Sequence, residues 1–423
     1  MPFSLENKLN WLYLDINSYF ATVEQQVNPE LRYKPIAVVP LLSDSTSAIA
    51  ASQEAKLKGI KTGTRIYEAK KLCPELICIQ ARHELYVEYH NKIFQEVDRH
   101  LQVDHIFSID EGACRLTGKY CSQEEAISIA KIIKEAIKTN VGDYITCSIG
   151  VASNRYLAKI ASNMQKPDGL VVIAPEDLPQ KLYDLSLRDL PGIGSRTYEK
   201  ILGKGISTIE ELCRFDAKRL KAVWGSVWGE KVWYLMRGAD LPLEATQKST
   251  IGHSQVLAPE LRGVGQARNI LITLVLKAAH RLRSKSLYAN SIVLSVELMS
   301  RQTIKSSIKI EASCDNNSFT KPVLKSWDNL VKLNELKEVR KVSISLHGLQ
   351  TETKQLCFSD LQAERKQQVL SRAIDSLNEK LGSNSVTIGV SPNQHKTKAI
   401  VAFGHIPNQP KKIKQVGKTS DDK

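Results

Sequence analysis

The stretch Phe107-Ser108-Ile109-Asp110-Glu111 places two adjacent carboxylates at the end of a short apolar run, and a second run follows from Ala113 to Thr117. The two runs predict a buried hairpin that carries Asp110 and Glu111. Like charges held together in a low-dielectric neighbourhood cost on the order of several kcal/mol unless a cation neutralises them. We therefore expect a cation beside this pair.

A third acid with the same character is Asp15, which directly ends the strand-like run Trp11-Leu12-Tyr13-Leu14. Three hard carboxylates favour Mg²⁺. Two such ions would activate an attacking oxygen and stabilise a leaving phosphate, as in polymerases and nucleases. Taken alone, however, the acids fit better an ordinary turn at 110–111 and a helix cap at Asp15, so the flanking sequence has to decide.

The flanking sequence resembles a known family. The segments Asp15-Ile16-Asn17-Ser18-Tyr19-Phe20-Ala21-Thr22-Val23-Glu24 and Ser108-Ile109-Asp110-Glu111 closely resemble the two metal-binding motifs of the Y-family translesion DNA polymerases, the DinB/UmuC type, and the resemblance extends from about Asn10 to about Leu349. It implies that Asp15, Asp110 and Glu111 are catalytic and, with Ile16, bind two Mg²⁺ ions. It also places Tyr19 and Phe20 at the nucleotide, with Phe20 as the steric gate against ribonucleotides.

Length and charge agree with a large protein that binds a polyanion. The chain has 423 residues and a formal net charge of +14, which favours several domains and a polyanionic partner, although charge alone cannot separate DNA from RNA or an acidic membrane. No apolar run reaches the length of a membrane span, and the N-terminus lacks the layout of a signal peptide. We therefore expect a cytoplasmic protein with no membrane partner.

The predicted fold class is α+β, a multi-domain right-hand polymerase. Strands and helices alternate over roughly the first 170 residues, which predicts a sheet with helices on one face. With the family resemblance, this gives the following domains: palm at 1–20 and 84–178, fingers at 21–83, a helix-hairpin-helix thumb at 179–243, a little finger at 248–350, and a C-terminal extension at 351–423.

Three residues are expected to face the triphosphate of the incoming nucleotide by resemblance: Gln53, Lys56 and Lys166. Without the resemblance, the two lysines would be ordinary solvated side chains. The sequence departs from the DinB type here, since those members carry a tyrosine and an arginine where this chain has Gln53 and Lys56. A lysine at this position resembles the UmuC type.

The segment Leu190-Pro191-Gly192-Ile193-Gly194 opens a helical region. Small glycines before a helix fit a helix-hairpin-helix, in which exposed backbone N–H groups at Gly192 and Gly194 hold a DNA phosphate without reading sequence. The alternative is a turn between two helices that needs glycine only for its backbone angles. Trp224, Trp228 and Trp233 follow and are expected to form the core of this thumb.

The chain restarts after 250 with alternating strands, notably 292–298 and 341–347, whose apolar residues share one face. Between 244 and 350 lysine and arginine outnumber acids about two to one. One sheet face and the helix end at Arg281, Arg283 and Lys285 are therefore candidates to follow a duplex backbone. An ordinary solvated sheet would also account for much of this charge.

The C-terminal extension carries a short motif, Gln355-Leu356-Cys357-Phe358, in which Gln355, Leu356 and Phe358 resemble the peptide by which bacterial polymerases dock on the sliding clamp. Four residues leave clamp docking and a plain loop equally open. An amphipathic helix is expected at 363–381, and the basic tail 411–423 has the composition of a disordered segment.

Together these features predict a Mg²⁺-dependent, error-prone translesion DNA polymerase that acts in DNA damage tolerance and the SOS response. Its expected partners are primer-template DNA, deoxynucleoside triphosphates, a sliding clamp and mutagenesis accessory proteins. Two alternatives stay open: a non-catalytic adaptor of the same family, which would be expected to have lost acids, and a palm-fold nucleotidyl cyclase, which would have no duplex to hold.

Overall fold

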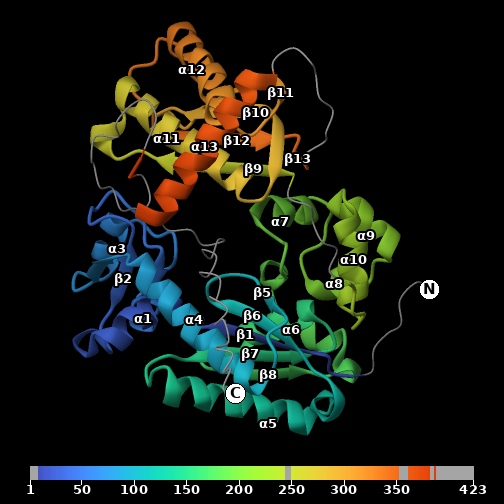
Figure 1. The fold of residues 1–423 in the computed structure, drawn as a ribbon. Helices are drawn as coiled ribbons and strands as arrows, with labels where there is room; N and C mark the ends of the chain where they lie inside the picture. Colours follow the sequence, from blue (N-terminus) through green and yellow to red (C-terminus); the bar gives the residue numbers. More distant parts are fainter. Residues whose placement is uncertain (1–7, 243–248, 352–360, 382–384, 387–423) are drawn as a thin grey trace, which may run out of the picture. The chain divides into compact units, whose positions relative to one another are not determined.

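A computed structural model of the chain describes residues 8–242, 249–351, 361–381 and 385–386 (Figure 1). The described chain divides into two compact units, one up to Pro242 and the other from Ser249 onward. The first unit contains two sheets and the second contains one. None of the described helices is both long and apolar enough to cross a membrane.

The first unit contains a five-stranded sheet in which β1 is the central strand. All six residues of β1 are buried. β1 pairs antiparallel with β6 and β7, while β8 runs parallel to β7. The strand order is β5(His105–Ile106), β6(Glu111–Arg115), β1(Trp11–Ile16), β7(Cys147–Ala152) and β8(Leu170–Ile173). The predicted hairpin around the acidic pair is therefore confirmed, as β5 and β6.

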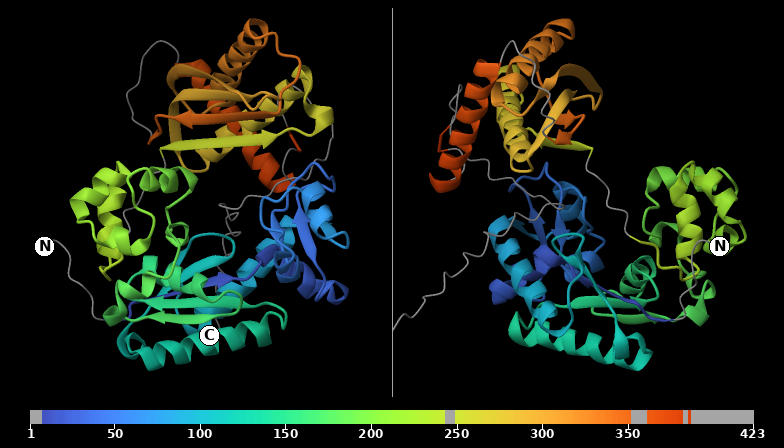
Figure 2. Two further views of the ribbon diagram at one scale, coloured as in Figure 1. Left: turned by 180° about the vertical axis from the view of Figure 1, so that it is seen from behind. Right: turned by 45° about the vertical axis from the view of Figure 1, so that its right-hand side comes forward.

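Helices cover both faces of this sheet (Figures 1 and 2). Leu12 and Leu14 on one face pack with α4(His83–His100) and α5(Gln123–Asn140). Trp11 and Tyr13 on the other face pack with α6(Arg155–Met164) and with the helices after residue 194. The prediction of helices on one face only was wrong, because β1 is apolar on both sides and each side needs a cover.

A smaller sheet lies within residues 21–83, the segment predicted to be the fingers. Its order is β3(Ala50–Ala51), β2(Ile36–Val39) and β4(Ile77–Gln80). The nearby helices are α1(Tyr19–Val27), α2(Gln53–Leu57) and α3(Ile66–Leu72). A core of small and β-branched residues, including Val39, Ala55 and Ile66, holds the sheet to α2 and α3.

Four helices lie within residues 179–243, the segment predicted to be the thumb: α7(Ser195–Leu202), α8(Ile209–Cys213), α9(Ala217–Trp224) and α10(Val227–Leu235). Their core is continuous with the α6 face of the large sheet. The buried amide of Asn154 donates to the backbone carbonyls of Leu235 and Ala239, at 2.8 and 3.0 Å, and Trp11 Nε1 donates to Asp240 at 2.9 Å. These bonds fix the end of the thumb to the sheet.

The second unit is an antiparallel sheet backed by helices. The strand order is β11(Thr303–Ser313), β10(Leu287–Glu297), β12(Lys341–His347) and β9(Thr250–Val256), with β13(Gln350–Thr351) paired to β10. The alternation predicted for 292–298 and 341–347 is confirmed, since Ile292, Leu294 and Val296 are buried together with Val342, Ile344 and Leu346. These residues pack with α11(Val264–Arg283) and α12(Asn316–Leu333).

The predicted C-terminal helix is present as α13(Leu361–Leu381) and packs on this second unit. Arg283, whose side chain is 5% exposed, makes two bonds to Asp375 at 2.6 and 2.8 Å. Buried Ser371 accepts from the backbone N–H of Asn316. Arg283 is thus an internal partner of α13, so its prediction as a DNA-facing charge was wrong.

The remaining regular elements are short 3₁₀ turns. They are η1(Pro29–Leu31), η2(Gly118–Cys121), η3(Pro175–Asp177), η4(Gln180–Leu182), η5(Leu187–Asp189) and η6(Pro259–Leu261).

Candidate active site

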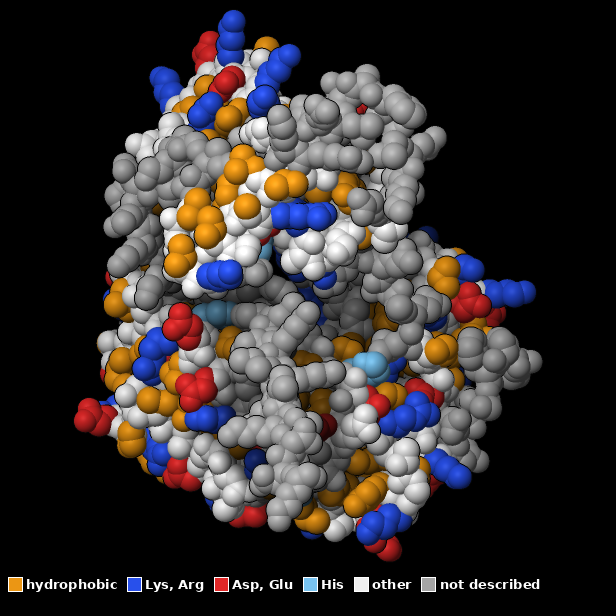
Figure 3. All heavy atoms as spheres, in the orientation of Figure 1, with side chains coloured by type: hydrophobic (Ala, Val, Ile, Leu, Met, Phe, Trp, Pro, Cys, Tyr) orange, Lys and Arg blue, Asp and Glu red, His pale blue; other side chains and the backbone are white. Residues whose placement is uncertain are grey.

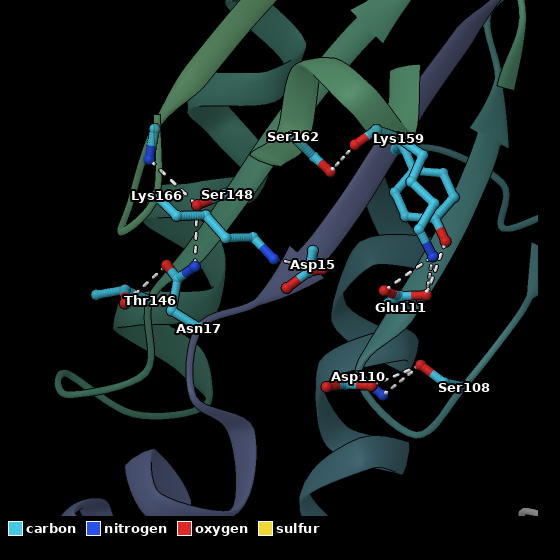
Figure 4. Close-up of polar contacts among 12 residues, drawn as sticks. Asp15, Asn17, Ser108, Asp110, Glu111, Thr146, Ser148, Lys159, Ser162 and Lys166 are labelled. Atoms are coloured by element: carbon cyan, nitrogen blue, oxygen red, sulfur yellow. Dashed lines mark hydrogen bonds and ion pairs between the residues drawn. The ribbon is translucent and has the colours of Figure 1, made fainter. Parts of the chain in front are cut away.

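The acids predicted from the sequence come together at one end of the large sheet (Figure 4). Asp15 lies directly opposite Glu111 in the β1–β6 pairing, and Asp110 precedes Glu111 in the connection to β6. The backbone N–H of Ile16 donates to the carbonyl of Asp110 at 3.0 Å, which fixes this connection to β1. Gly112 is needed for the close packing here, because a Cβ at this position would lie 2.4 Å from the Phe94 ring of α4.

Each acid has its own polar partner. Lys166 pairs with Asp15 at 2.7 Å. Lys159 of α6 contacts both oxygens of Glu111, at 2.9 and 3.1 Å, and the Tyr13 hydroxyl donates to Glu111 at 2.9 Å. The remaining acid, Asp110, accepts from the hydroxyl of Ser108 at 2.5 Å. The cations beside Asp15 and Glu111 reduce the cost of burying like charges side by side.

The pKa values of the acids differ because their surroundings differ. Burial raises the pKa of Asp15 to about 6, with Lys166 opposing the rise and the neighbouring acids adding to it. Burial also raises the pKa of Asp110, against the Ser108 hydrogen bond. Burial acts in the same upward direction on Glu111, but the Lys159 and Tyr13 contacts outweigh it and lower its pKa. Neighbouring carboxyls with perturbed pKa values are typical of functional sites.

A cavity of about 290 Å³ opens beside Asp15 and Asp110. It brings together most of the residues predicted to bind the nucleotide and metal: Asp15, Ile16, Tyr19, Phe20, Lys56, Asp110 and Lys166 all line it. Burial and the nearby Lys166 lower the pKa of Lys56, while Asp15 opposes this change. Two lysines facing two carboxylates in one cavity provide binding groups for a metal-bound polyphosphate.

Two predicted residues are placed differently. Gln53 is the first residue of α2 and does not line the cavity, although Lys56 of the same helix does. Glu111 is turned towards Lys159 and Tyr13 and also lies outside the cavity lining. In the described part of the chain, no three His, Cys, Asp or Glu side chains converge closely enough to hold a metal ion as they stand.

The donor set nevertheless fits divalent cations. Asp15, Asp110 and Glu111 are neighbouring carboxylates, oxygen ligands of the kind that Mg²⁺ prefers. The pKa values of Asp15 and Asp110 are raised chiefly because burial disfavours their charged forms, and the neighbouring acids add to the rise. Lysine side chains now supply the compensating charge. If Lys159 and Lys166 turn away, Asp15 and Glu111 become available as metal ligands.

The turn that carries Lys166 is held by residues that sequence reasoning missed. Asn17 accepts from the backbone N–H of Asp168 at 2.8 Å and donates to Ser148 at 2.9 Å. Lys134 of α5 bonds the Asp168 carboxylate and the carbonyl of Cys147, both at 2.6 Å. These contacts join the turn to β1 and β7 and so place Lys166 beside Asp15 (Figure 4).

Comparisons with known proteins identify the family of the chain. Models of the impB/mucB/samB family match residues 14–163 and, as its C-terminal domain, 248–358, and a model of the DNA polymerase-iota thumb domain matches 188–240. The DNA polymerase IV of Moorella thermoacetica is 32% identical over 392 residues, which cover 90% of this chain and 95% of that protein. The DNA polymerase IV of Oceanobacillus iheyensis is 29% identical over 395 residues, covering 90% and 92%.

A solved structure described as "Y-family DNA polymerase chimera Dbh-Dpo4(243-245)-Dbh" aligns with a TM-score of 0.69 at 23% identity and covers 81% of this chain and 100% of that one. The chain belongs to the Y family of DNA polymerases. The family predicted from the two acidic motifs, and the right-hand architecture predicted with it, are confirmed.

The Y-family thumb contains the predicted glycine turn. Gly192 has a φ of +93°, a conformation that L side chains rarely adopt, and a Cβ there would lie 2.8 Å from Trp228 Nε1. Gly194 is the N-cap of α7 and provides no side-chain cap. Trp228 is 39% exposed and packs beside this turn, whereas Trp224 is 8% exposed. The expectation that Trp224, Trp228 and Trp233 form the thumb core therefore holds for Trp224 and for Trp233, which is partly buried against the same core, but not for Trp228.

Two residues of this Y-family site, Tyr13 and Lys159, were also missed. Tyr13 lies two positions before Asp15, and the strand period of two puts both side chains on the same face. That pattern could have identified it. Lys159 is one of several helical lysines and has no local signal, because its contact with Glu111 depends on how α6 packs across the sheet. The predicted clamp residues Gln355, Leu356 and Phe358 lie outside the described residues.

Proposed function

We propose that this Y-family chain is a template-directed DNA polymerase that adds deoxynucleotides to a primer 3′ end and copies damaged template. The observation that carries the proposal is that Asp15 and Asp110 line one cavity with Lys56 and Lys166, while Glu111 lies directly opposite Asp15 on the neighbouring strand. Carboxylates for divalent cations and lysines for a triphosphate are the groups that nucleotidyl transfer needs.

Asp15, Asp110 and Glu111, with the backbone carbonyl of Ile16, would hold two Mg²⁺ ions. When bound, the ions lower the pKa of the primer 3′-hydroxyl and neutralise charge on the triphosphate. For this set to form, Glu111 gives up Lys159 and Tyr13, and Asp15 gives up Lys166. Lys166 is then available to bind the triphosphate together with Lys56. Gln53, the first residue of the helix that carries Lys56, is proposed to bind the triphosphate as well.

The sugar of the nucleotide would lie against Tyr19 and Phe20. Both residues are in the first turn of α1, directly after β1 has delivered Asp15, and both line the cavity. An aromatic ring at Phe20 leaves no room for a 2′-hydroxyl, so a ribonucleotide has to displace the ring or bind out of line with the primer.

Primer-template DNA is proposed to contact both units. In the thumb, the backbone around Gly192 and Gly194 offers N–H groups to a phosphate. In the second unit, the sheet face away from α11 and α12 is rich in serine and lysine, and Lys305, Lys309 and Lys341 belong to it by the strand alternation. Such charges bind a duplex backbone without reading its sequence. Figure 3 also shows Lys or Arg side chains where α12 lies, with acidic side chains among them, but α12 covers the other face of this sheet, so these charges do not belong to the proposed DNA surface.

A sliding clamp is proposed as a partner through Gln355, Leu356 and Phe358, and mutagenesis accessory proteins as further partners, in the cytoplasm and in response to DNA damage. Replacing the three motif residues by alanine should leave distributive synthesis unchanged and remove stimulation by a loaded clamp. Equal stimulation of both proteins would show that the segment is only a loop.

The proposal is tested by primer extension on intact and abasic templates, with Mg²⁺ and with EDTA. Metal-dependent extension on both templates is expected. DNA binding without extension would favour a non-catalytic adaptor, and a cyclic nucleotide formed without primer would favour a cyclase. Both outcomes would contradict the proposal.

A further inference from the structure

The ring of Phe20 rests on a second aromatic ring, that of Tyr86 in α4. The two ring centroids are 4.3 Å apart and the planes are inclined by 19°, so the rings are stacked. Tyr86 is completely buried, and Phe20 is 3% exposed while lining the cavity. We infer that Tyr86 is a positioning residue that fixes the Phe20 ring and thereby sets how strictly this enzyme excludes ribonucleotides; this inference rests on the proposed polymerase function.

The hydroxyl of Tyr86 is tied to the same helix that carries Phe20. It donates to Glu24 Oε1 at 2.7 Å, and Glu24 lies one turn after Phe20 on α1. Glu24 is completely buried, and Arg82 compensates its charge through a 3.0 Å bond from Nε and a second contact to the other oxygen. Tyr86 therefore contacts α1 at two points a turn apart, through its ring and through its hydroxyl.

A third contact closes this arrangement. The hydroxyl of Tyr19 donates to the backbone carbonyl of Tyr86 at 2.5 Å, and the Tyr19 ring lies 5.6 Å from the Phe20 ring in a tilted orientation. Phe20 thus has an aromatic ring from its own helix on one side and Tyr86 on another. Since interiors are close-packed, the Phe20 ring cannot withdraw from the cavity without displacing the fully buried Tyr86.

The discrimination of a steric gate depends on the free energy needed to move the gate. A 2′-hydroxyl that meets a freely tilting ring pushes it aside at small cost, whereas a ring backed by a flat, tethered neighbour resists. Replacing Tyr86 by leucine removes the flat surface and the tether to Glu24. The Phe20 ring can then move aside for the 2′-hydroxyl of a ribonucleotide. Incorporation of a deoxyribonucleotide is affected less, because it has no 2′-hydroxyl to meet the ring.

The experiment measures single-nucleotide kcat/KM for a ribonucleotide and a deoxyribonucleotide opposite the same template base, together with the melting temperature. The variants are Tyr86→Leu, Tyr86→Phe, Phe20→Ala and the double variant Tyr86→Leu with Phe20→Ala. Ile93→Ala is the matched control, because Ile93 is a completely buried residue of α4 that does not line the cavity.

We expect Tyr86→Leu to raise the ratio of ribonucleotide to deoxyribonucleotide use at least fivefold. Tyr86→Phe keeps the stacked ring but loses the bond to Glu24, so it should raise the ratio at least twofold. In the Phe20→Ala background, Tyr86→Leu should change the ratio by less than twofold, because the ring on which Tyr86 acts is gone. Ile93→Ala should lower the melting temperature and leave the ratio unchanged.

An unchanged ratio in folded Tyr86→Leu, while Phe20→Ala raises it, overturns the role of Tyr86 and leaves the polymerase proposal intact. If Tyr86→Leu does not fold, an unchanged ratio in Tyr86→Phe has the same meaning. Equal effects of Tyr86→Leu with and without Phe20 also overturn the inference. Absence of deoxynucleotide incorporation by the wild-type protein would instead contradict the proposed function itself.

Discussion

Asp15 and Glu111 face each other across the antiparallel strands β1 and β6, and each is paired with a different lysine, Lys166 at 2.7 Å and Lys159 at 2.9 Å. Lys159 lies in the middle of α6, and Lys166 lies in the turn that follows this helix. Both acids thus have counterions within the protein. Under the proposed function, a divalent cation would replace these lysines as the partner of the two carboxylates.

The first prediction concerns the pH dependence of stability. Because the pKa of Asp15 is raised to about 6, the folded protein binds a proton between about pH 4 and pH 6 that the unfolded chain releases. The free energy of unfolding of the metal-free protein should therefore fall as pH rises through this range, by about 2–3 kcal/mol from this group. Urea unfolding in EDTA at several pH values measures this change in the free energy of unfolding.

The control is Asp15→Asn, in which this part of the pH dependence should be missing. Addition of Mg²⁺ at pH 7 should raise the urea midpoint of the wild-type protein more than that of the variant. Identical pH profiles for the two proteins would show that Asp15 does not have the raised pKa.

The second prediction is that Lys166→Ala raises the KM for deoxynucleotides about tenfold or more, since a charge-assisted hydrogen bond is worth about 1.5–3 kcal/mol. The value of kcat should change less, and duplex affinity should stay the same, because Lys166 lines the nucleotide cavity. Lys119→Ala is the control, since Lys119 is exposed and pairs with Glu125. A parallel loss of DNA affinity would place Lys166 on the primer-template instead.

The third prediction is that Phe20→Ala raises the ratio of ribonucleotide to deoxyribonucleotide incorporation at least tenfold, equivalent to roughly 1.4 kcal/mol. If Phe20 were only a core residue of α1, its truncation would lower use of both sugars equally. The kcat/KM values for both sugars opposite one template base distinguish these results, and an unchanged ratio in a folded variant would reject Phe20 as the gate.

The fourth prediction concerns the attachment of α13. Asp375→Asn leaves the buried guanidinium of Arg283 without its carboxylate and should cost about 3 kcal/mol in the second unit. Hydrogen exchange at the end of α11 and along α13 should accelerate. Asp328→Asn, which removes an acid that is 64% exposed in a looser pair with Arg268, should have little effect. Equal exchange in the two variants would mean that the Asp375 contact does not hold the helix.

Local signals in the sequence were sufficient for the strands, the family and most of the cavity. Asp15 and Asp110 each end or follow a short apolar run, so a short-range pattern identifies these acids. The alternation of apolar residues at 292–298 and 341–347 likewise shows which face of the second sheet is buried. Phe20 could also be identified from a short-range pattern. It lies five residues after Asp15, and this short segment contains only the end of β1 and the start of α1.

What the sequence did not reveal depends on contacts between distant segments. Lys159 reaches Glu111 only because α6 crosses the face of the sheet opposite α4 and α5, and Tyr86 stacks on Phe20 only because α4 packs against α1. The charge of Arg283 suggested a surface role, but its side chain is buried and pairs with Asp375, 92 positions further along the chain. Residue type and spacing contain no information about such pairings.

The central claim, that Asp15, Asp110 and Glu111 are the metal-binding acids of a DNA polymerase, is tested most directly by Asp110→Asn. Primer extension and duplex binding are measured on one preparation of wild-type and variant protein. The neutral amide is a poor metal ligand and the DNA phosphates are bound elsewhere, so extension should be abolished while duplex affinity stays within a few-fold of wild type. Extension by folded Asp110→Asn at a rate near that of the wild type would contradict the account.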